Sequence, residues 1–147
     1  MKKQADLQMH TAEHILNRTM VRMFVLGRHF INSDIEKKES TCDYRFDHSL
    51  SLYEIDEIES RVNRVIKNDI PVTESFVSKD EVERFYDTTW LSHEVAGKIR
   101  IIRISHFDAR PCIGDHVTST GEVGGFRITT TCYDDGVLRI RFKLGIP

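Results

Sequence analysis

Residues 51–70, SLYEIDEIESRVNRVIKNDI, form the most regular segment of this sequence. Its apolar residues recur at helical spacing and share one face; they are Leu52, Ile55, Ile58, Val62, Val65 and Ile66. Ser51 and Glu54 match a capping box at the start, and Pro71 follows the end. A helix with one apolar face must bury that face, so this segment requires a second layer of structure to pack against.

The C-terminal part of the chain supplies strands for that layer. Residues 124–133 and 137–144 both have strand-like composition, and the Asp-Gly turn between them predicts a β-hairpin. Further strands are expected at 41–49, 71–77 and 98–105, and further helices at His10–Leu26, where Gly27 follows as a stop, and at 79–87. The sequence therefore predicts an α+β fold with a largely antiparallel sheet packed against helices, in a single domain covering residues 1–147.

Charge and composition exclude several functional classes. The 147 residues carry a formal net charge of -2, so no global positive field attracts nucleic acid, and a nucleic-acid partner would need a local basic patch. Apolar runs are too short to cross a bilayer, and no apolar stretch follows Lys2 and Lys3 as in a signal peptide. Three cysteines suit a reducing compartment, so we expect a cytoplasmic protein.

Two short motifs each contain a pair of metal-binding residue types four positions apart. HTAEH places His10 and His14 on one face of the first predicted helix, about 6 Å apart, where one ion can bridge them. CIGDH places Cys112 and His116 in a loop. Together the pairs offer three nitrogens and one sulfur, a set that suits Zn²⁺ better than Mg²⁺ or Ca²⁺. The sequence leaves open whether such a site is structural or catalytic.

The first motif has a competing interpretation. HTAEH also fits H-x-x-E-H, the inverted zinc-protease pattern, in which Glu13 would be a general base. That interpretation needs a further carboxylate ligand downstream and leaves the CIGDH motif unexplained. Glu13 is equally suited to a solvated position near the start of a helix.

The two motifs in this order, HTAEHIL and CIGDHVTSTGEVGGFRI, resemble the editing domain of alanyl-tRNA synthetases. They are still more similar to the freestanding alanyl-tRNA editing proteins called AlaX, and more distantly to the editing domain of threonyl-tRNA synthetases. The resemblance covers nearly the whole chain. It implies the fold of the second additional domain of these synthetases.

The resemblance also implies a ligand set and an activity. Zn²⁺ would be bound by His10, His14, Cys112 and His116. The reaction would be hydrolysis, in trans, of the ester linking serine or glycine to alanine tRNA. An alternative is a binding module for tRNA or another partner, in which zinc only holds the fold together.

The motif departs from the usual C-G-G-T-H of alanine enzymes at Ile113 and Asp115. Asp115 offers a carboxylate that could orient a ligand histidine, or it could be an exposed loop residue. These departures leave the identity of the preferred amino acid open.

Three further residues are candidates for the reaction itself. Thr118 and Gly121 follow the second motif, where they would line the pocket and let backbone N–H groups approach a ligand. A turn between loop and strand explains them equally well. Ser33, with Asn32 as an alternative one residue away, is the counterpart implied by the resemblance for the threonine that binds the hydroxyl of serine. Asn-Ser-Asp is also ordinary turn chemistry.

Contacts with tRNA phosphates are expected from a basic edge. Its candidate members are Lys2, Lys3, Arg18, Arg22 and Arg28. Solvated helix charges are the competing explanation, and we favour it for Arg22.

Overall fold

A computed structural model of the protein describes residues 4–24, 30–78, 80, 98–111 and 116–145. Two α-helices, seven strands and one short 3-10 helix lie within these residues. In chain order they are α1 (Gln4–Met23), β1 (Phe30–Asp34), β2 (Ser40–Arg45), α2 (Leu52–Lys67), β3 (Val72–Ser78), β4 (Lys98–Ile104), β5 (Asp108–Pro111), η1 (Thr120–Val123), β6 (Phe126–Asp134) and β7 (Val137–Leu144).

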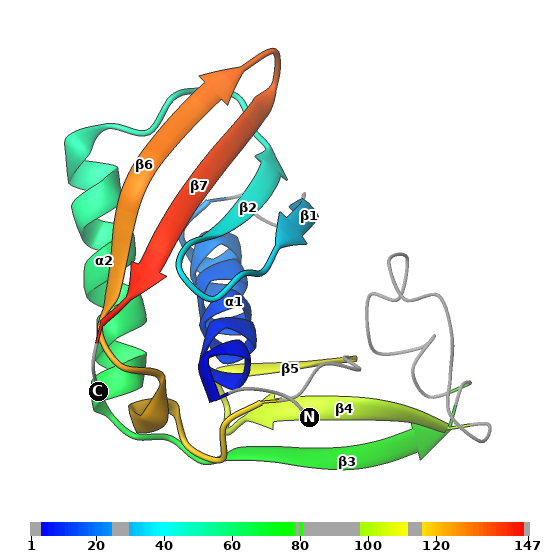
Figure 1. Ribbon diagram of the computed structural model, residues 1–147. Coiled ribbons are helices and arrows are strands. Elements are labelled where there is room, and N and C mark those ends of the chain that lie inside the picture. The colour runs from blue at the N-terminus through cyan, green and yellow to red at the C-terminus, as the bar shows by residue number, and fades with distance from the viewer. Residues whose placement is uncertain (1–3, 25–29, 79, 81–97, 112–115, 146–147) are drawn as a thin grey trace.

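The strands form two sheets, and every pair of neighbours is antiparallel. One sheet has the order β1-β2-β7-β6, and the other has the order β3-β4-β5. In Figure 1 the two helices stand side by side against the four-stranded sheet, and the three-stranded sheet lies below, at the N-terminal end of α1. The predicted α+β class with antiparallel sheets is confirmed.

The main core lies between the helices and the four-stranded sheet. Helix α2 contributes the buried part of the apolar stripe expected from the sequence, and β7 alternates buried and exposed residues as a strand with one covered face does. The fully or nearly buried members from α1, α2 and β7 are Met9, Ala12, Ile15, Leu16, Met20, Ile58, Val62, Val65, Ile66, Leu138, Ile140 and Phe142. A smaller cluster in the three-stranded sheet is centred on Ile99 and Ile101.

Two local predictions are confirmed in detail. Ser51 Oγ accepts the Glu54 N–H at 3.1 Å and Glu54 Oε1 accepts the Ser51 N–H at 2.8 Å, which completes the capping box of α2. The β6–β7 turn consists of Asp135 and Gly136, with φ of 49° and 81°. Positive φ at both central residues is what a two-residue hairpin turn requires.

Other boundaries differ from the prediction. Helix α1 begins at Gln4 rather than His10, because its buried face continues upstream through Met9, with Leu7 packed beside it. The polar segment 106–111 contains β5, which pairs with β4 at the edge of its sheet and was not expected from composition. The predicted stop at Gly27 and, apart from residue 80, the helix at 79–87 lie outside the described residues.

None of the helices in the described part of the chain is both long and apolar enough to cross a membrane.

Candidate functional site

The N-terminal half of α1 brings together three of the four predicted metal ligands. His10 and His14 lie one helical turn apart, and the chain returns after β5 to place His116 beside them. The ring centres of His14 and His116 are 4.4 Å apart, and those of His10 and His116 are 6.2 Å apart. His14 is buried, with 2% of its surface exposed, whereas His10 and His116 are partly exposed. The site is therefore a cluster of imidazoles with one buried and two accessible members.

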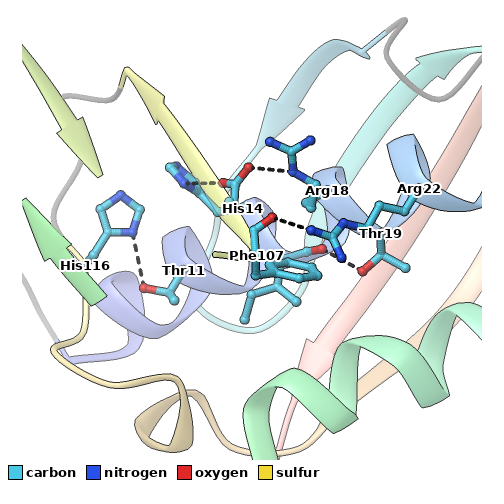
Figure 2. A network of polar contacts seen from close by, with 9 residues as sticks. Thr11, His14, Arg18, Thr19, Arg22, Phe107 and His116 are labelled. Atoms are coloured by element: carbon cyan, nitrogen blue, oxygen red, sulfur yellow. Dashed lines mark hydrogen bonds and ion pairs between the residues drawn. The ribbon is translucent and has the colours of Figure 1, made fainter. Parts of the chain in front are cut away.

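Thr11 holds His116 and the start of the following chain. Its hydroxyl donates to the Leu7 carbonyl at 3.0 Å and accepts the Val117 N–H at 3.2 Å. The same oxygen lies 3.2 Å from His116 Nδ1, a contact that Figure 2 shows. A hydroxyl has one proton and two lone pairs, and the proton is used at Leu7. We therefore assign the proton of this contact to His116 Nδ1, which makes Nε2 the basic nitrogen of that ring.

The segment after His116 is fixed by the end of α2. Val72 N–H donates to the Thr118 carbonyl at 2.9 Å, and Thr120 N–H donates to the Ile70 carbonyl at 2.9 Å. The buried Thr120 hydroxyl donates to the Val65 carbonyl at 2.8 Å and accepts the Ile70 N–H at 2.7 Å. These bonds connect residues about fifty positions apart, so the segment that follows His116 is held by contacts with the end of α2 and the chain after it.

Asp108, at the start of β5, stands behind His14. Its Oδ1 accepts the Nε–H of Arg18 at 3.0 Å, and its Oδ2 lies 3.6 Å from His14 Nδ1. Figure 2 draws both contacts as dashed lines, at the side chains of His14 and Arg18. Asp115, which the sequence offers as a possible partner of a ligand histidine, lies outside the described residues. Asp108 was not predicted to have such a role. Its signal in the sequence was weak, because it sits in a segment that resembles a polar turn.

Ser33 is hydrogen-bonded to Glu13 of helix α1, the helix that carries His10 and His14. Ser33, on β1, donates its hydroxyl proton to Glu13 Oε2, and Glu13 lies three residues after His10 on α1. β1 reaches this position because it pairs with β2, with Ser33 opposite Cys42. Ser33 is thus part of a strand and not only of a turn, and it is adjacent to the histidine helix.

Thr118 follows His116 by two residues, and Gly121 lies in the short helix η1. Thr118 is exposed, and its hydroxyl donates to Glu122 Oε2 at 2.5 Å. The Gly121 N–H donates to Asp69 Oδ1 at 3.0 Å, so its backbone donor has an internal acceptor. The structure explains both residues by contacts within the protein, and their predicted roles in the reaction stay predictions.

Zinc binding also stays a prediction. Cys112, Ile113 and Asp115 lie outside the described residues. Among residues 4–24, 30–78, 80, 98–111 and 116–145, no group of three or more histidine, cysteine, aspartate or glutamate side chains stands in a metal-binding arrangement. His116 nevertheless lies close to both His10 and His14. Cys112 precedes His116 by four residues in the sequence.

The basic edge expected from the sequence is partly used inside the protein. Arg18 binds Asp108, and Arg22 donates to the Phe107 carbonyl at 3.2 Å with its guanidinium 4.8 Å from the centre of the Phe107 ring. Lys2, Lys3 and Arg28 lie outside the described residues. Both described arginines therefore attach α1 to the corner between β4 and β5.

Comparison with known proteins gives a consistent result. Residues 99–141 match the family described as threonyl and alanyl tRNA synthetase second additional domain. The chain is related to this domain. It is 32% identical to the alanine–tRNA ligase of Aeropyrum pernix and 34% identical to that of Methanothrix thermoacetophila, in both cases over 98% of the chain. It is also 32% identical to the alanine–tRNA ligase of Fervidobacterium nodosum over 99% of the chain.

The predicted resemblance to the editing domain of alanyl-tRNA synthetases is therefore confirmed. The aligned region, which contains both the HTAEH and CIGDH motifs, is a small part of these relatives. The chain spans 16% of the Aeropyrum and Methanothrix ligases and 17% of the Fervidobacterium ligase.

Proposed function

We propose that this domain hydrolyses the ester of mischarged aminoacyl-tRNA in trans, with seryl- or glycyl-tRNA(Ala) as substrate, and that Zn²⁺ supports the reaction. The observation that carries the proposal is the convergence of His10, His14 and His116 in a chain related to alanyl-tRNA synthetases. Relationship to these ligases favours an aminoacyl ester over the peptide bond that a zinc protease would cleave.

The donor set fits zinc. Two imidazoles bound to one tetrahedral Zn²⁺ have ring centres about 5 Å apart, given Zn–N bonds of about 2.0–2.1 Å. The observed separations of 4.4 Å and 6.2 Å fall on either side of this value. His10, His14 and His116 would provide nitrogen, and Cys112 would provide sulfur. A bound Zn²⁺ would supply Lewis acidity, for a carbonyl oxygen or for a water molecule.

The protein's own residues prepare this site. Thr11 accepts the Nδ1 proton of His116 and so keeps Nε2 as the basic nitrogen. His14 is buried against Asp108, whereas His10 and His116 remain partly exposed and thus face the side from which substrate can arrive. The arrangement has one shielded and one accessible side.

Ser33 is our candidate for recognition of the serine side chain. Because its hydroxyl donates to Glu13, its oxygen keeps lone pairs that can accept the hydroxyl proton of a seryl group. An alanyl group has no such proton. Its binding would cover the half-buried Ser33 acceptor without supplying a donor, which disfavours it. Glu13 would thereby make the Ser33 hydroxyl an acceptor toward the substrate. In the protease interpretation Glu13 would instead have been a general base.

The first experiment measures deacylation of seryl-, glycyl- and alanyl-tRNA(Ala) by zinc-loaded protein. Cys112→Ala is expected to abolish hydrolysis, and the matched control Cys132→Ala, which alters an exposed free cysteine on β6, is expected to leave it unchanged. Hydrolysis of the seryl or glycyl ester that spares the alanyl ester supports the proposal. No hydrolysis above buffer with any of the three refutes it and leaves either another aminoacyl-tRNA as substrate or the zinc-stabilised binding module.

A second experiment separates recognition from chemistry. Ser33→Ala is expected to lower kcat/KM for seryl-tRNA about five- to tenfold, the value of one hydrogen bond of about 1–1.4 kcal/mol. Glycyl-tRNA has no side-chain hydroxyl, so its hydrolysis is the internal control and is expected to change little. An equal loss on both substrates would show that Ser33 supports the fold or the reaction and does not read the side chain.

A further inference from the structure

Asp108 is a buried carboxylate whose surroundings connect it to His14. Only 6% of Asp108 is exposed. A carboxylate buried to this extent is costly unless it is paired, because it loses its hydration. Arg18 supplies the pairing through its Nε at 3.0 Å, and this leaves the second carboxylate oxygen 3.6 Å from His14 Nδ1.

The position of Asp108 is fixed from the helix side. Arg18 and Arg22 lie one turn apart on α1, and they hold Asp108 and the carbonyl of Phe107 respectively. The Phe107 N–H also donates to the Ile104 carbonyl at 2.9 Å, which closes the corner between β4 and β5. The carboxylate is therefore bound to the same helix that carries His14.

We propose that Asp108, held by Arg18, is a positioning residue that orients His14 as a metal ligand. The carboxylate faces Nδ1 of the ring, and the opposite nitrogen, Nε2, is thereby turned away from Asp108. At 3.6 Å the contact is beyond hydrogen-bond length and acts through charge, which favours a ring whose Nδ1 carries the proton. Carboxylates in this position fix the tautomer and raise the basicity of ligand histidines. The inference rests on the proposed zinc site.

The test is titration of metal-free protein with Co²⁺, followed by its d–d absorption and by competition with Zn²⁺. Asp108→Asn keeps the size of the side chain and removes its charge. It is expected to weaken Co²⁺ and Zn²⁺ binding by about 10- to 100-fold. The matched control is Asp43→Asn. Asp43 lies on β2, in the other sheet, and is similarly buried, with 8% of its surface exposed. Its carboxylate accepts two hydrogen bonds from Arg139, at 2.9 Å and 3.0 Å. The control is expected to retain wild-type affinity.

A second variant covers the case in which Asp108→Asn does not fold. Arg18→Gln leaves the carboxylate in place and removes its anchor, and the Arg18 side chain is one-third exposed at 33%. Its Co²⁺ affinity is expected to fall in the same direction, with an altered d–d spectrum.

The outcomes distinguish this inference from the proposed function. Wild-type affinity in Asp108→Asn, or in Arg18→Gln where the first variant is unfolded, overturns the positioning role and leaves the metal site standing. Equal weakening in Asp43→Asn also overturns it, because the effect would then follow from lost stability. Absence of Co²⁺ binding in the wild-type protein overturns the zinc site itself, and the positioning role with it.

Discussion

Thr11 makes three hydrogen-bond contacts, and replacing it with valine tests how the site is held. Thr11→Val keeps the shape and β-branching of the side chain and removes its hydroxyl. The Val117 N–H then loses its acceptor at 3.2 Å, in a position where Val117 is only 3% exposed. An unsatisfied buried donor costs about 1–3 kcal/mol. For a domain of this size that corresponds to a decrease in Tm of roughly 3–9 °C.

Thr19→Val is the matched control. Thr19 is also buried on α1 and also donates to the carbonyl four residues earlier, at 2.8 Å from Ile15. Within the described residues its hydroxyl accepts no hydrogen bond, so its loss is expected to change stability by less than about 0.5 kcal/mol. Valine and threonine have similar helix propensity, so the helix itself contributes little to the comparison.

The assay is thermal unfolding followed by circular dichroism, with chelator present throughout. The chelator removes any contribution of bound metal, so the difference between the variants reports the hydrogen bonds of the protein alone. Equal decreases in Tm for Thr11→Val and Thr19→Val would refute the reasoning, because both variants lose the bond within the helix and only Thr11 accepts the Val117 N–H.

Two further predictions concern residues around the site and on the surface. Gly121→Ala is expected to lower the free energy of unfolding by about 1–3 kcal/mol in urea titrations, because the added Cβ would lie 2.4 Å from Asp69 Oδ1. Adding Asp69→Ala should relieve part of that loss. If the effects of the two substitutions are strictly additive in the double variant, this explanation is contradicted. The pKa of His48 is raised above 6.5 by its hydrogen bonds to Asp47 and then Glu54. Its stabilising effect is therefore present below pH 6.5 and lost as the pH rises through the folded pKa. We expect His48→Gln to cost less than about 1 kcal/mol near pH 6 and nothing near pH 9, the small size reflecting its exposure; a cost independent of pH would refute the ionic origin.

Local chemistry explains why parts of the fold were predicted correctly. The capping box of Ser51 and Glu54 and the turn at Asp135 and Gly136 depend on residues within three positions of each other. The apolar stripe of α2 can be read from helical periodicity alone, because the identity of the layer that buries it does not affect the pattern. Such features follow from backbone preferences and periodicity, which the sequence carries directly.

The site is a different case. Its motifs could be recognised because HTAEH and CIGDH each keep two donors four positions apart. The position of His116 beside His10 and His14 depends on contacts distant in sequence, among them those of Thr11 and Thr120. The carboxylate of Asp108 beside His14 was not predicted, because it lies in a segment that resembles a polar turn, ninety positions from its partner Arg18. Asp115 lies outside the described residues, and its role stays a prediction.

The sequence by itself determined the α+β class, the ends of α2, the β6–β7 hairpin and the relationship to alanyl-tRNA synthetases, because each is encoded in short-range spacing or in motifs. Only the tertiary structure decided that Arg18 and Arg22 bind the β4–β5 corner, that Ser33 donates to Glu13, and that Thr11 contacts His116. These contacts join residues 20 to 105 positions apart. A polar side chain does not specify its partner over such distances; the packing of the core between them does.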